Sequence, residues 1–346
     1  MRWIVAGGGT GGHFFPALEV AKGLIREGDQ VLYVGVRRGI EARIMPSTGI
    51  SHRLIDFEGV RGRGIKALSA MIKLLPSLMN VFGIFREFRP DAVFLTGGYV
   101  SVPIFLVALI LGVPIFIHEQ NSVPGLSNVV ISGFARKVFV TFEESIRYLR
   151  GFKFILSGNV IREEFLNETY PTKSSFNLLV LGGSLGARSI NRTLIGILDK
   201  LKALNVRILH QTGRLDYKEV VEAYKRLSYD NAFTFDFHDK PWDLLKSATI
   251  VVSRAGSSTI TEVVLAGRCA IFVPYPYAVS DHQFFNARII SKLAPVRILE
   301  DKNLDRLFSM LFLYYMDRRK MAKVEDKTRR CFIVGRVKSI VKNLKE

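Results

Sequence analysis

Acidic side chains are scarce in this sequence. Among 346 residues there are 31 Asp and Glu against 49 Lys and Arg, which gives a net charge of +18. A protein with such a surplus usually has a polyanionic partner, which can be nucleic acid, anionic lipid or a phosphorylated substrate. Composition alone does not distinguish these three kinds of partner, and the sequence motifs are needed to do so.

Cysteine is scarce as well, and no apolar run is long. Cys269 and Cys331 stand far apart and outside any Cys-x-x-Cys pattern, so neither a zinc site nor a redox pair is expected, and a reducing cytoplasm fits. The longest apolar run, residues 102–117, is interrupted by Gly112 and Pro114 and is short for a membrane span. Residues 1–6 are expected to form a buried strand rather than a signal peptide.

What is present is a repeated alternation of apolar strands and helices. Near-continuous apolar strands separated by helices predict a parallel sheet covered on both faces. The pattern loosens near residues 151–163, passes through a polar linker at 170–176, and then restarts. The sequence therefore predicts an α/β protein with two Rossmann-like doubly wound domains, residues 1–160 and 161–346, that face a deep cleft. The C-terminal helix is expected to pack on one of them, and it can return to the first.

A glycine-rich turn follows the first strand of each half, at Gly7–Gly12 and Gly182–Gly186. Glycine lets the backbone approach an anion, and the helix that follows offers unpaired N–H groups at its positive end. Dinucleotide enzymes share the first pattern, but the second strand here is followed by Val36, Arg37 and Arg38 rather than an acid. The absence of an acid weakens the case for an NAD-binding enzyme and leaves an NADP-binding enzyme open. The presence of two such turns, one in each half, favours two anion-binding sites.

The motifs around these turns, taken together, resemble the MurG family of peptidoglycan N-acetylglucosaminyltransferases. The matching segments are Gly8–Ala17, Gly97–Pro103, His118–Asn121, Gly158–Arg162, Gly182–Arg188, Arg254–Ser257 and Asp281–Ala287. They run in order through most of the chain. Three positions depart from the family pattern, namely Val160, Leu185 and Ser257, and Leu185 puts one polar contact near the donor in doubt.

The resemblance implies a GT-B fold and a defined reaction. A member of this family moves GlcNAc from UDP-GlcNAc to the C4 hydroxyl of MurNAc in lipid I, with inversion, giving lipid II and UDP. The implied partners are thus UDP-GlcNAc, lipid I and an anionic membrane surface, with no nucleic acid. The implied location is the cytoplasmic face of the cell membrane, as a peripheral protein.

His13, at the start of the helix after the first turn, is the candidate catalytic base. An inverting transfer needs a group that takes the proton of the acceptor hydroxyl, and a histidine titrates near neutrality. Arg162 and Ser184 are expected to stabilise the departing diphosphate. A carboxylate at Glu262, just inside another helix, can accept both ribose hydroxyls.

The resemblance assigns further residues to the two substrates. On the donor side these are Thr10, Gly11, Gly12, Asn121, His238 through its backbone, Ser257, Ser258, Thr259 and Gln283. On the acceptor side they are Gly9, Thr10, His13 and Tyr99. His118, Glu119 and Gln120 are expected to hold their loop together rather than to react.

No cofactor and no metal are expected. Metal-dependent glycosyltransferases hold a divalent ion on the diphosphate with an Asp-x-Asp pair, and the sequence lacks one. Helix dipoles and cationic side chains would then carry that role.

An apolar stripe rimmed by cations lies in residues 65–89 and suits a surface helix at an anionic bilayer. The candidate membrane residues are Ile72, Leu75, Met79, Phe82 and Phe85, and Pro76 is expected to break or bend the segment.

Three other functions stay open at this stage. A related enzyme could glycosylate diacylglycerol, an NADP-dependent oxidoreductase would use only the first glycine turn, and a nucleic-acid-binding protein would explain the charge. The last lacks a recognisable binding signature.

Overall fold

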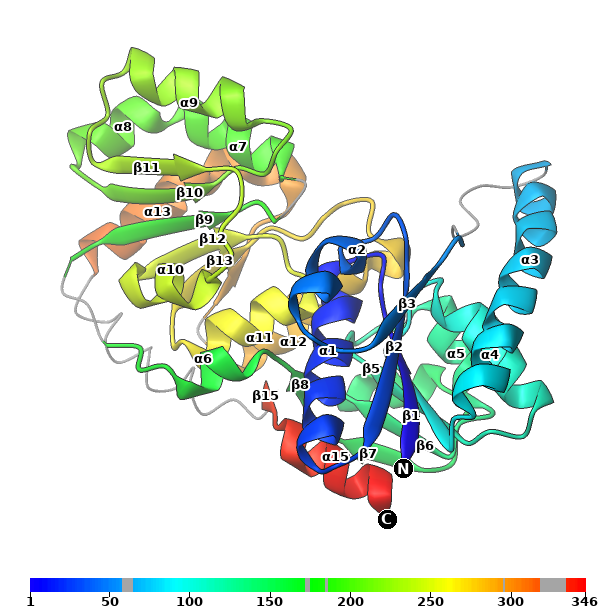
Figure 1. Ribbon diagram of the computed structural model, residues 1–346. Helices are drawn as coiled ribbons and strands as arrows, with labels where there is room; N and C mark the ends of the chain where they lie inside the picture. Colours follow the sequence, from blue (N-terminus) through cyan, green and yellow to red (C-terminus); the bar gives the residue numbers. More distant parts are fainter. Residues whose placement is uncertain (58–64, 172–174, 184–185, 295, 318–333) are drawn as a thin grey trace. The chain divides into compact units, whose positions relative to one another are not determined.

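The computed structural model describes the chain except residues 58–64, 172–174, 184–185, 295 and 318–333; of residues 65–73 and 334 it describes the backbone alone. The chain divides into two compact units (Figure 1). The first consists of Met1–Arg162 with Phe332–Glu346, and the second of Glu163–Cys331. The chain thus leaves the first unit after Arg162 and returns to it for its last residues.

Within its described residues, the first unit contains a sheet of seven parallel strands in the order β3-β2-β1-β4-β5-β6-β7. The strands are β1 Arg2–Ala6, β2 Gln30–Val36, β3 His52–Ile55, β4 Ala92–Leu95, β5 Ile115–Glu119, β6 Lys137–Val140 and β7 Phe154–Leu156. The α-helices of the unit are α1 Gly11–Arg26, α2 Glu41–Ile44, α3 Ile65–Phe88, α4 Ser101–Ile110, α5 Leu126–Ser132 and α15 Val337–Lys345. Single 3₁₀ turns follow α2 and β6, at Met45–Ser47 and Glu143–Tyr148.

Successive side chains of β1 point to opposite faces, and both faces are buried. Trp3 and Val5 belong to the core under α1 and α15, whereas Ile4 and Ala6 belong to the core under α3, α4 and α5. For this reason the strand sequences are continuously apolar, without the alternation of apolar and polar residues that a half-exposed strand shows.

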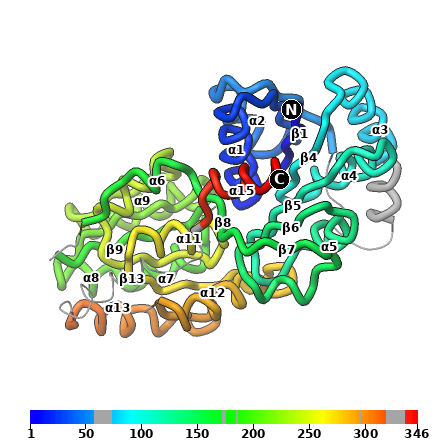
Figure 2. Tube along the Cα trace, turned by 90° about the horizontal axis from the view of Figure 1, so that it is seen from below, coloured from blue at the N-terminus to red at the C-terminus, as the bar shows by residue number. Residues whose placement is uncertain are grey.

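The C-terminal segment belongs to the first unit. The short strand β15, Val334–Gly335, pairs with β8, Asn159–Val160, and α15 packs along α1 (Figure 2). The two helices approach so closely that a Cβ on Gly23 would lie 2.3 Å from Cγ1 of Val337.

The second unit repeats the architecture with six parallel strands among its described residues, in the order β11-β10-β9-β12-β13-β14. These are β9 Asn177–Leu181, β10 Arg207–Gln211, β11 Ala232–Phe235, β12 Ile250–Ser253, β13 Cys269–Phe272 and β14 Arg297–Ile298. The α-helices are α6 Glu163–Asn167, α7 Arg188–Gly196, α8 Leu198–Ala203, α9 Tyr217–Arg226, α10 Pro241–Ser247, α11 Ser257–Leu265, α12 His282–Leu293 and α13 Leu307–Met316, with 3₁₀ turns at Val279–Asp281 and Asp301–Arg306.

Two parallel, doubly wound sheets confirm the predicted fold class. Of the two effects predicted for Pro76, a break does not occur, because α3 continues through this residue. The turns after Pro76 pack Val81, Ile84 and Phe85 into the core, and this burial outweighs the backbone hydrogen bond that proline removes. Among the described residues, no helix is both long and apolar enough to cross a membrane.

Candidate active site

Each sheet reverses its strand order at one place, and the glycine turns lie there. In the first unit the reversal falls between β1 and β4, and in the second between β9 and β12. In open parallel sheets, ligands bind beyond the carboxyl ends of the strands at such a switch point. The loops that follow these four strands are therefore the candidate site residues of the two units.

In the first unit, the loop after β1 lies against the loop after β4. Gly9 has a φ of +80°, and a Cβ at this position would lie 2.8 Å from the Tyr99 ring. Both facts require glycine. The candidate acceptor residue Tyr99 therefore lies beside the first glycine turn, and its side chain is half-buried. Thr10 is exposed and precedes α1, whose first residues are Gly11 and Gly12; first-turn amides have no partner within a helix.

His13 is the third residue of α1 and is held from two sides by other loops. Its Nδ1 lies 2.8 Å from the carbonyl oxygen of Thr96 and 3.0 Å from Oε1 of Gln120. The Thr96 hydroxyl in turn donates to the His13 carbonyl oxygen, at 2.7 Å. The imidazole is thereby fixed at the carboxyl ends of β1, β4 and β5.

Gly9, a candidate diphosphate ligand, has its backbone N–H engaged within the protein. Its N–H donates to the carboxylate of Glu41, with distances of 3.2 and 3.3 Å to the two oxygens. Glu41 is fully buried and also accepts the N–H of Val36, at 3.0 Å. The Glu41 carboxylate therefore already accepts the N–H of Gly9, whereas Thr10, Gly11 and Gly12 lie at the start of α1.

The segment after β5 is held by its own side chains, as predicted. Glu119 Oε1 accepts from the backbone N–H of Asn121 at 2.8 Å and from its Nδ2 at 3.2 Å. Oε2 accepts from Nδ2 of Asn128, at 2.8 Å. Burial raises the pKa of Glu119 to about 7, against which these hydrogen bonds act. Asn121 is thus oriented at the carboxyl end of β5.

Gln120 and His118 connect the same segment to β8. Nε2 of Gln120 lies 3.0 Å from both Nδ1 and the carbonyl oxygen of His118, and Nε2 of His118 lies 3.0 Å from the carbonyl oxygen of Gly158. Burial lowers the pKa of His118 to about 4. Arg162, a few residues after Gly158, lies over the ring of Phe15 with its Cζ 4.5 Å from the centroid.

In the second unit, the second glycine turn packs against the loop after β10. Gly186 has a φ of +93°, and a Cβ there would lie 2.5 Å from the carbonyl oxygen of Thr212. Ser184 and Leu185 lie outside the described residues.

The start of α11 collects several candidate donor residues after β12. Gly256 precedes the helix, Ser257 is buried, and Thr259 is half-buried. Oγ of Ser258 is buried and has no hydrogen-bond partner within the part of the chain that the structure describes. Such an orphan hydroxyl, beside first-turn amides, fits a phosphate ligand. Glu262 lies one turn further along the same helix and is half-buried.

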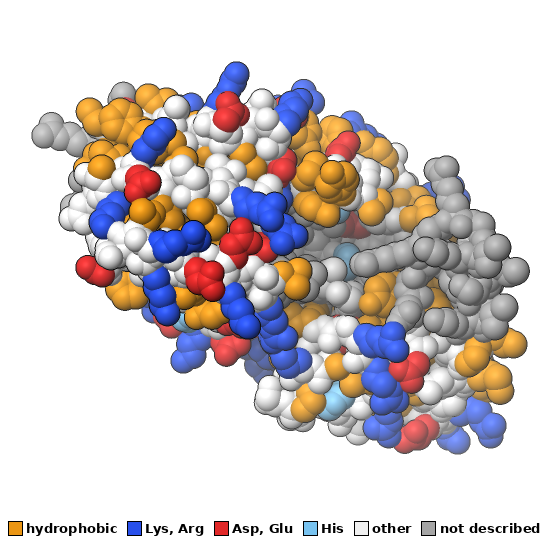
Figure 3. Space-filling model, turned by 90° about the horizontal axis from the view of Figure 1, so that it is seen from above, with side chains coloured by type: hydrophobic (Ala, Val, Ile, Leu, Met, Phe, Trp, Pro, Cys, Tyr) orange, Lys and Arg blue, Asp and Glu red, His pale blue; other side chains and the backbone are white. Residues whose placement is uncertain are grey.

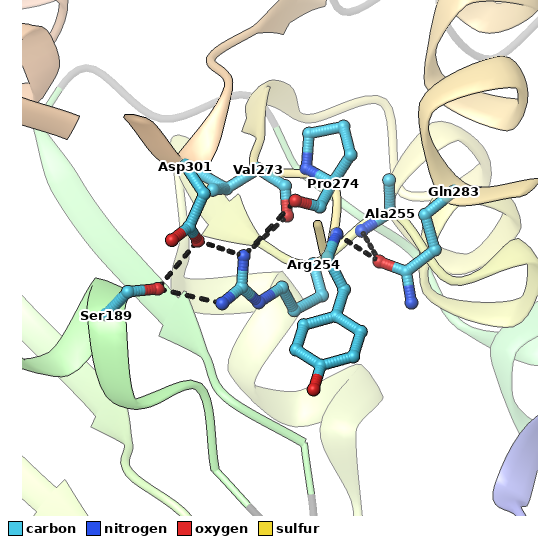
Figure 4. A network of polar contacts seen from close by, with 8 residues as sticks. Ser189, Arg254, Ala255, Val273, Pro274, Gln283 and Asp301 are labelled. Carbon is cyan, nitrogen blue, oxygen red and sulfur yellow. Dashed lines mark hydrogen bonds and ion pairs between the residues drawn. The ribbon is translucent and has the colours of Figure 1, made fainter. Parts of the chain in front are cut away.

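Arg254 ties four segments of the second unit together (Figure 4). It donates to the carbonyl oxygens of Val273 and Pro274, each at 3.3 Å, to Oδ1 of Asp301 at 2.6 Å and to Oγ of Ser189 at 2.8 Å. Ser189 also donates to Asp301, at 2.7 Å. The loops after β12 and β13 are thereby fixed to the start of α7.

Gln283, a predicted GlcNAc ligand, makes loop contacts with one end of its amide. Its Oε1 accepts from the N–H groups of Ala255 and Tyr275, at 3.2 and 2.9 Å (Figure 4). The oxygen is therefore engaged within the protein, and the amide nitrogen is the end that can donate to a sugar hydroxyl. His238 follows β11, and its Nδ1 accepts the N–H of Lys240 at 3.1 Å.

The candidate membrane residues separate into two groups. Leu75, Met79 and Phe82 are 64%, 71% and 41% exposed. Phe85 is only 3% exposed and packs in the core, so its assignment to a membrane face is wrong. The side chain of Ile72 lies outside the described residues.

The basic residues of the second unit are interspersed with acidic ones. On the face shown in Figure 3, Lys and Arg side chains lie among Asp and Glu side chains over this unit, and Arg192 pairs with Glu219 at 3.7 Å. This is the pattern of a solvated surface.

Two contributors to the site were not found from the sequence. Glu41 stands six residues after Gly35 with no motif around it, and Asp301 is far in sequence from the arginine that it pairs with. An acid shortly after the second strand was the only available signal for Glu41. Nothing local marked Asp301.

Comparison with known proteins agrees with this geometry over both units. The glycosyltransferase family 28 N-terminal domain matches residues 3–140, and the family 28 C-terminal domain matches residues 177–344. A relative from Syntrophus aciditrophicus is 38% identical over 312 residues, and the match covers 88% of this chain and 86% of the relative's chain. One from Citrifermentans bemidjiense is 39% identical and covers 95% of both chains. Both carry the name UDP-N-acetylglucosamine--N-acetylmuramyl-(pentapeptide) pyrophosphoryl-undecaprenol N-acetylglucosamine transferase.

Among solved structures, MurG from Acinetobacter baumannii superposes with a TM-score of 0.78 at 28% sequence identity and covers 99% of both chains. The GT-B fold and the family resemblance expected from the motifs are thereby confirmed: the chain belongs to glycosyltransferase family 28 and, within it, to the MurG family of N-acetylglucosaminyltransferases.

Proposed function

We propose that this protein transfers GlcNAc from UDP-GlcNAc to the C4 hydroxyl of MurNAc in lipid I, with inversion, and releases lipid II and UDP. The observation that carries the proposal is the name shared by relatives that are 38–39% identical along most of the chain. The loops at the switch points add support within each unit, because the first places a fixed histidine at a glycine-rich helix start and the second places the Ser258 hydroxyl at the start of α11.

In this proposal, His13 removes the proton of the acceptor hydroxyl. The hydroxyl oxygen forms a bond to C1 of GlcNAc while the bond from C1 to the UDP oxygen breaks, and UDP leaves with one negative charge more than it carried in UDP-GlcNAc, which balances the positive charge that His13 gains. Both groups that face Nδ1 of His13 are acceptors, so the neutral ring carries its proton there and its lone pair on Nε2. That nitrogen is the proton acceptor.

The two substrates divide the remaining roles. Thr10, Gly11, Gly12 and Tyr99 hold the acceptor diphosphate, and the first three also approach the donor sugar. Ser184, Ser257, Ser258 and Thr259 hold the UDP phosphates with Arg162, the carboxylate of Glu262 binds the ribose, and the backbone at His238 reads the uracil. Asn121 and the amide nitrogen of Gln283 donate to GlcNAc.

A transfer assay tests the function directly. Radiolabelled UDP-GlcNAc is offered with a short-chain lipid I analogue or with diacylglycerol, each with and without chelator. Label in the lipid I product alone, unchanged by chelator, is the expected result. Label in diacylglycerol would assign a different acceptor, and loss of transfer after chelation would overturn the proposal that no metal is needed.

His13→Ala tests the base. Turnover is expected to fall by about 10²- to 10⁴-fold, the usual contribution of a positioned base, while the dissociation constant of UDP changes little. Calorimetry with UDP supplies the second measurement. Turnover equal to that of the unchanged protein would remove His13 from this role.

We also propose that α3 contacts the cytoplasmic face of the membrane as a peripheral element. Leu75, Met79 and Phe82 are exposed apolar side chains on the turns before the buried Phe85, and Arg86 and Arg89 are exposed close by. Apolar groups rimmed by cations bind anionic bilayers most strongly at low salt. An undecaprenyl-linked acceptor also resides in a membrane.

Met79→Glu tests this contact against a matched control. Met316 on α13 is 67% exposed, close to the 71% of Met79, so Met316→Glu is the same change on the second unit. Sedimentation with anionic vesicles at low salt should fall about tenfold for Met79→Glu and stay unchanged for Met316→Glu. Equal sedimentation of the two variants would place the contact elsewhere.

A further inference from the structure

A directional chain of hydrogen bonds runs from Gly158, the residue before β8, to His13 at the start of α1. The carbonyl oxygen of Gly158 can only accept, so Nε2 of His118, 3.0 Å away, carries the proton. Nδ1 of His118 therefore keeps its lone pair. The ring is fully buried, and burial lowers its pKa to about 4, so it remains neutral near pH 7.

The amide of Gln120 can adopt only one orientation against this histidine. Two acceptors face it, Nδ1 and the carbonyl oxygen of His118, each 3.0 Å from the same end of the amide. That end has to be the NH₂ group, since an oxygen there would oppose two lone pairs. The amide oxygen is consequently the atom 3.0 Å from Nδ1 of His13.

At His13 the chain ends on a nitrogen that faces two acceptors, Oε1 of Gln120 and the carbonyl oxygen of Thr96. Nδ1 must therefore donate, and a neutral ring keeps its lone pair on Nε2. A neutral imidazole without such partners favours the opposite tautomer. The protein thus imposes the less common tautomer on His13 and the opposite one on His118.

We propose that Gln120 is a positioning residue for the transfer reaction, which holds His13 in the Nδ1–H tautomer and stabilises the imidazolium that forms when Nε2 takes the acceptor proton. The proposal rests on the role of His13 as the base. In the imidazolium, positive charge resides partly on Nδ1–H, which already donates to two carbonyl oxygens, so little reorganisation is needed. His118 and Gly158 set the direction of the amide.

A carboxylate, the usual partner of a catalytic histidine, would not serve at this position. In Gln120→Glu, one oxygen would face the lone pair and the carbonyl oxygen of His118, in a buried setting where such repulsion is costly. Gln120→Glu is therefore expected to be as poor as a variant with no hydrogen-bonding group, although glutamate is often regarded as an improved partner for histidine.

Nitrogen-15 NMR of the full-length protein tests the tautomers without any substrate. The chain has 6 histidines, and His13→Gln and His118→Gln assign the two resonance pairs. The expected spectrum shows His13 protonated at Nδ1 and His118 at Nε2. A proton on Nε2 of His13 would overturn the proposal, even where the transferase assay succeeds.

Gln120→Met preserves the length of the side chain but removes the amide. We expect kcat to fall about 10- to 100-fold, the UDP dissociation constant to stay within about twofold, and the acid limb of the kcat profile to move to lower pH. Ser145→Ala is the matched control, because Ser145 donates one buried hydrogen bond, to the Phe142 carbonyl oxygen at 2.7 Å.

The outcomes separate the two proposals. If kcat and pH profile of Gln120→Met follow those of Ser145→Ala, Gln120 is only a structural residue and the positioning proposal fails. If His13→Ala retains full turnover, the base itself is wrong, whatever the tautomer. If Gln120→Glu restores kcat to the level of the unchanged protein, the directional argument from His118 is wrong.

Discussion

Glu41 shapes the first glycine turn from behind. A Cβ on Gly8 would lie 2.1 Å from its Oε1, and one on Gly39 would lie 2.2 Å from its Oε2. The carboxylate fills the space that these glycines leave and takes the N–H groups of Gly9 and Val36. In NAD-dependent enzymes an acid in this region binds the ribose hydroxyls, whereas Glu41 is enclosed by the loop and is not available for that role.

Glu41→Ala should destabilise the first unit by about 2–4 kcal/mol, because the buried N–H of Val36 and the half-buried N–H of Gly9 lose their acceptor. Glu41→Gln keeps one acceptor oxygen and should cost about 1 kcal/mol. Each unit has one tryptophan, so denaturation followed by Trp3 fluorescence in a Trp242→Phe background reports the first unit alone. Equal stability of Glu41→Ala and the unchanged protein would contradict the assignment.

A second buried histidine makes the second unit sensitive to acid. Burial lowers the pKa of His210 to about 3, and the ring contacts Oδ1 of Asn191 at 3.0 Å and the Tyr224 hydroxyl at 3.3 Å. The unfolded chain binds a proton at His210 below about pH 6.5, whereas the folded chain does so only near pH 3. Stability is therefore fully present above pH 6.5 and is lost as pH falls toward 3.

The loss should reach about 4 kcal/mol between these limits, at 1.36 kcal/mol for each pH unit. His210→Gln removes the titrating group and should flatten this part of the stability profile. Urea denaturation followed by Trp242 fluorescence in a Trp3→Phe background, repeated across pH, measures it. A slope that survives in His210→Gln would show that other groups cause the acid sensitivity.

At the scale of the elements, the strands and the switch points follow from sequence because they depend on local pattern. Trp3, Ile4, Val5 and Ala6 are apolar in succession because both faces of β1 are covered, and the glycine turn fixes where the strand ends. The ties between loops do not follow from sequence. Ser189, Arg254 and Asp301 meet only after three segments have folded, and their spacing in the chain carries no period.

Arg254→Lys tests whether the contacts among Ser189, Arg254 and Asp301 support nucleotide binding. Lysine cannot reach Ser189, Asp301 and the two carbonyl oxygens together, because it lacks the planar fork of arginine. We expect the second unit to lose about 2 kcal/mol of stability and the affinity for UDP to fall about tenfold, since α11 begins just after Arg254. Calorimetry with UDP and Trp242-monitored denaturation measure the two effects.

Lys246→Ala is the control, because Lys246 forms ion pairs with Glu168 and Asp243 in the same unit and is not among the residues that Arg254 contacts. It should leave UDP binding unchanged. If Arg254→Lys loses stability but binds UDP with unchanged affinity, the contacts of Arg254 serve only the stability of the second unit.

At the scale of the whole molecule, the repeat of two doubly wound units could be predicted, but the path of the chain's end could not be fixed. The last helix is amphipathic, with Val337, Ile340, Val341 and Leu344 buried, and this pattern predicts a packed helix without saying on which unit. The position of the last helix depends on Gly23, because the absence of a side chain there leaves room on α1 for Val337 and Val341. A glycine within a helix gives no such signal in the sequence, since its partner is more than three hundred residues away.

Gly23→Ala should therefore destabilise the first unit, against the usual benefit of alanine in a helix. The added methyl would lie 2.3 Å from Cγ1 of Val337 and 3.0 Å from Cγ2 of Val341, and overpacking of this kind costs about 1–3 kcal/mol. Gly83→Ala on α3 is the matched control, because a Cβ there meets nothing within 4 Å, and it should stabilise by up to about 1 kcal/mol.

The double variant Gly23→Ala, Val337→Ala separates this clash from a general effect on α1. Shortening Val337 removes the atom that the new methyl would meet, so the two changes together should cost less than the sum of the single changes, by about 1 kcal/mol or more. Trp3-monitored denaturation in the Trp242→Phe background measures all four proteins of the cycle. Strict additivity would mean that Val337 does not pack against Gly23 in solution, and the position of α15 would then have to be set by other contacts, such as the pairing of β15 with β8.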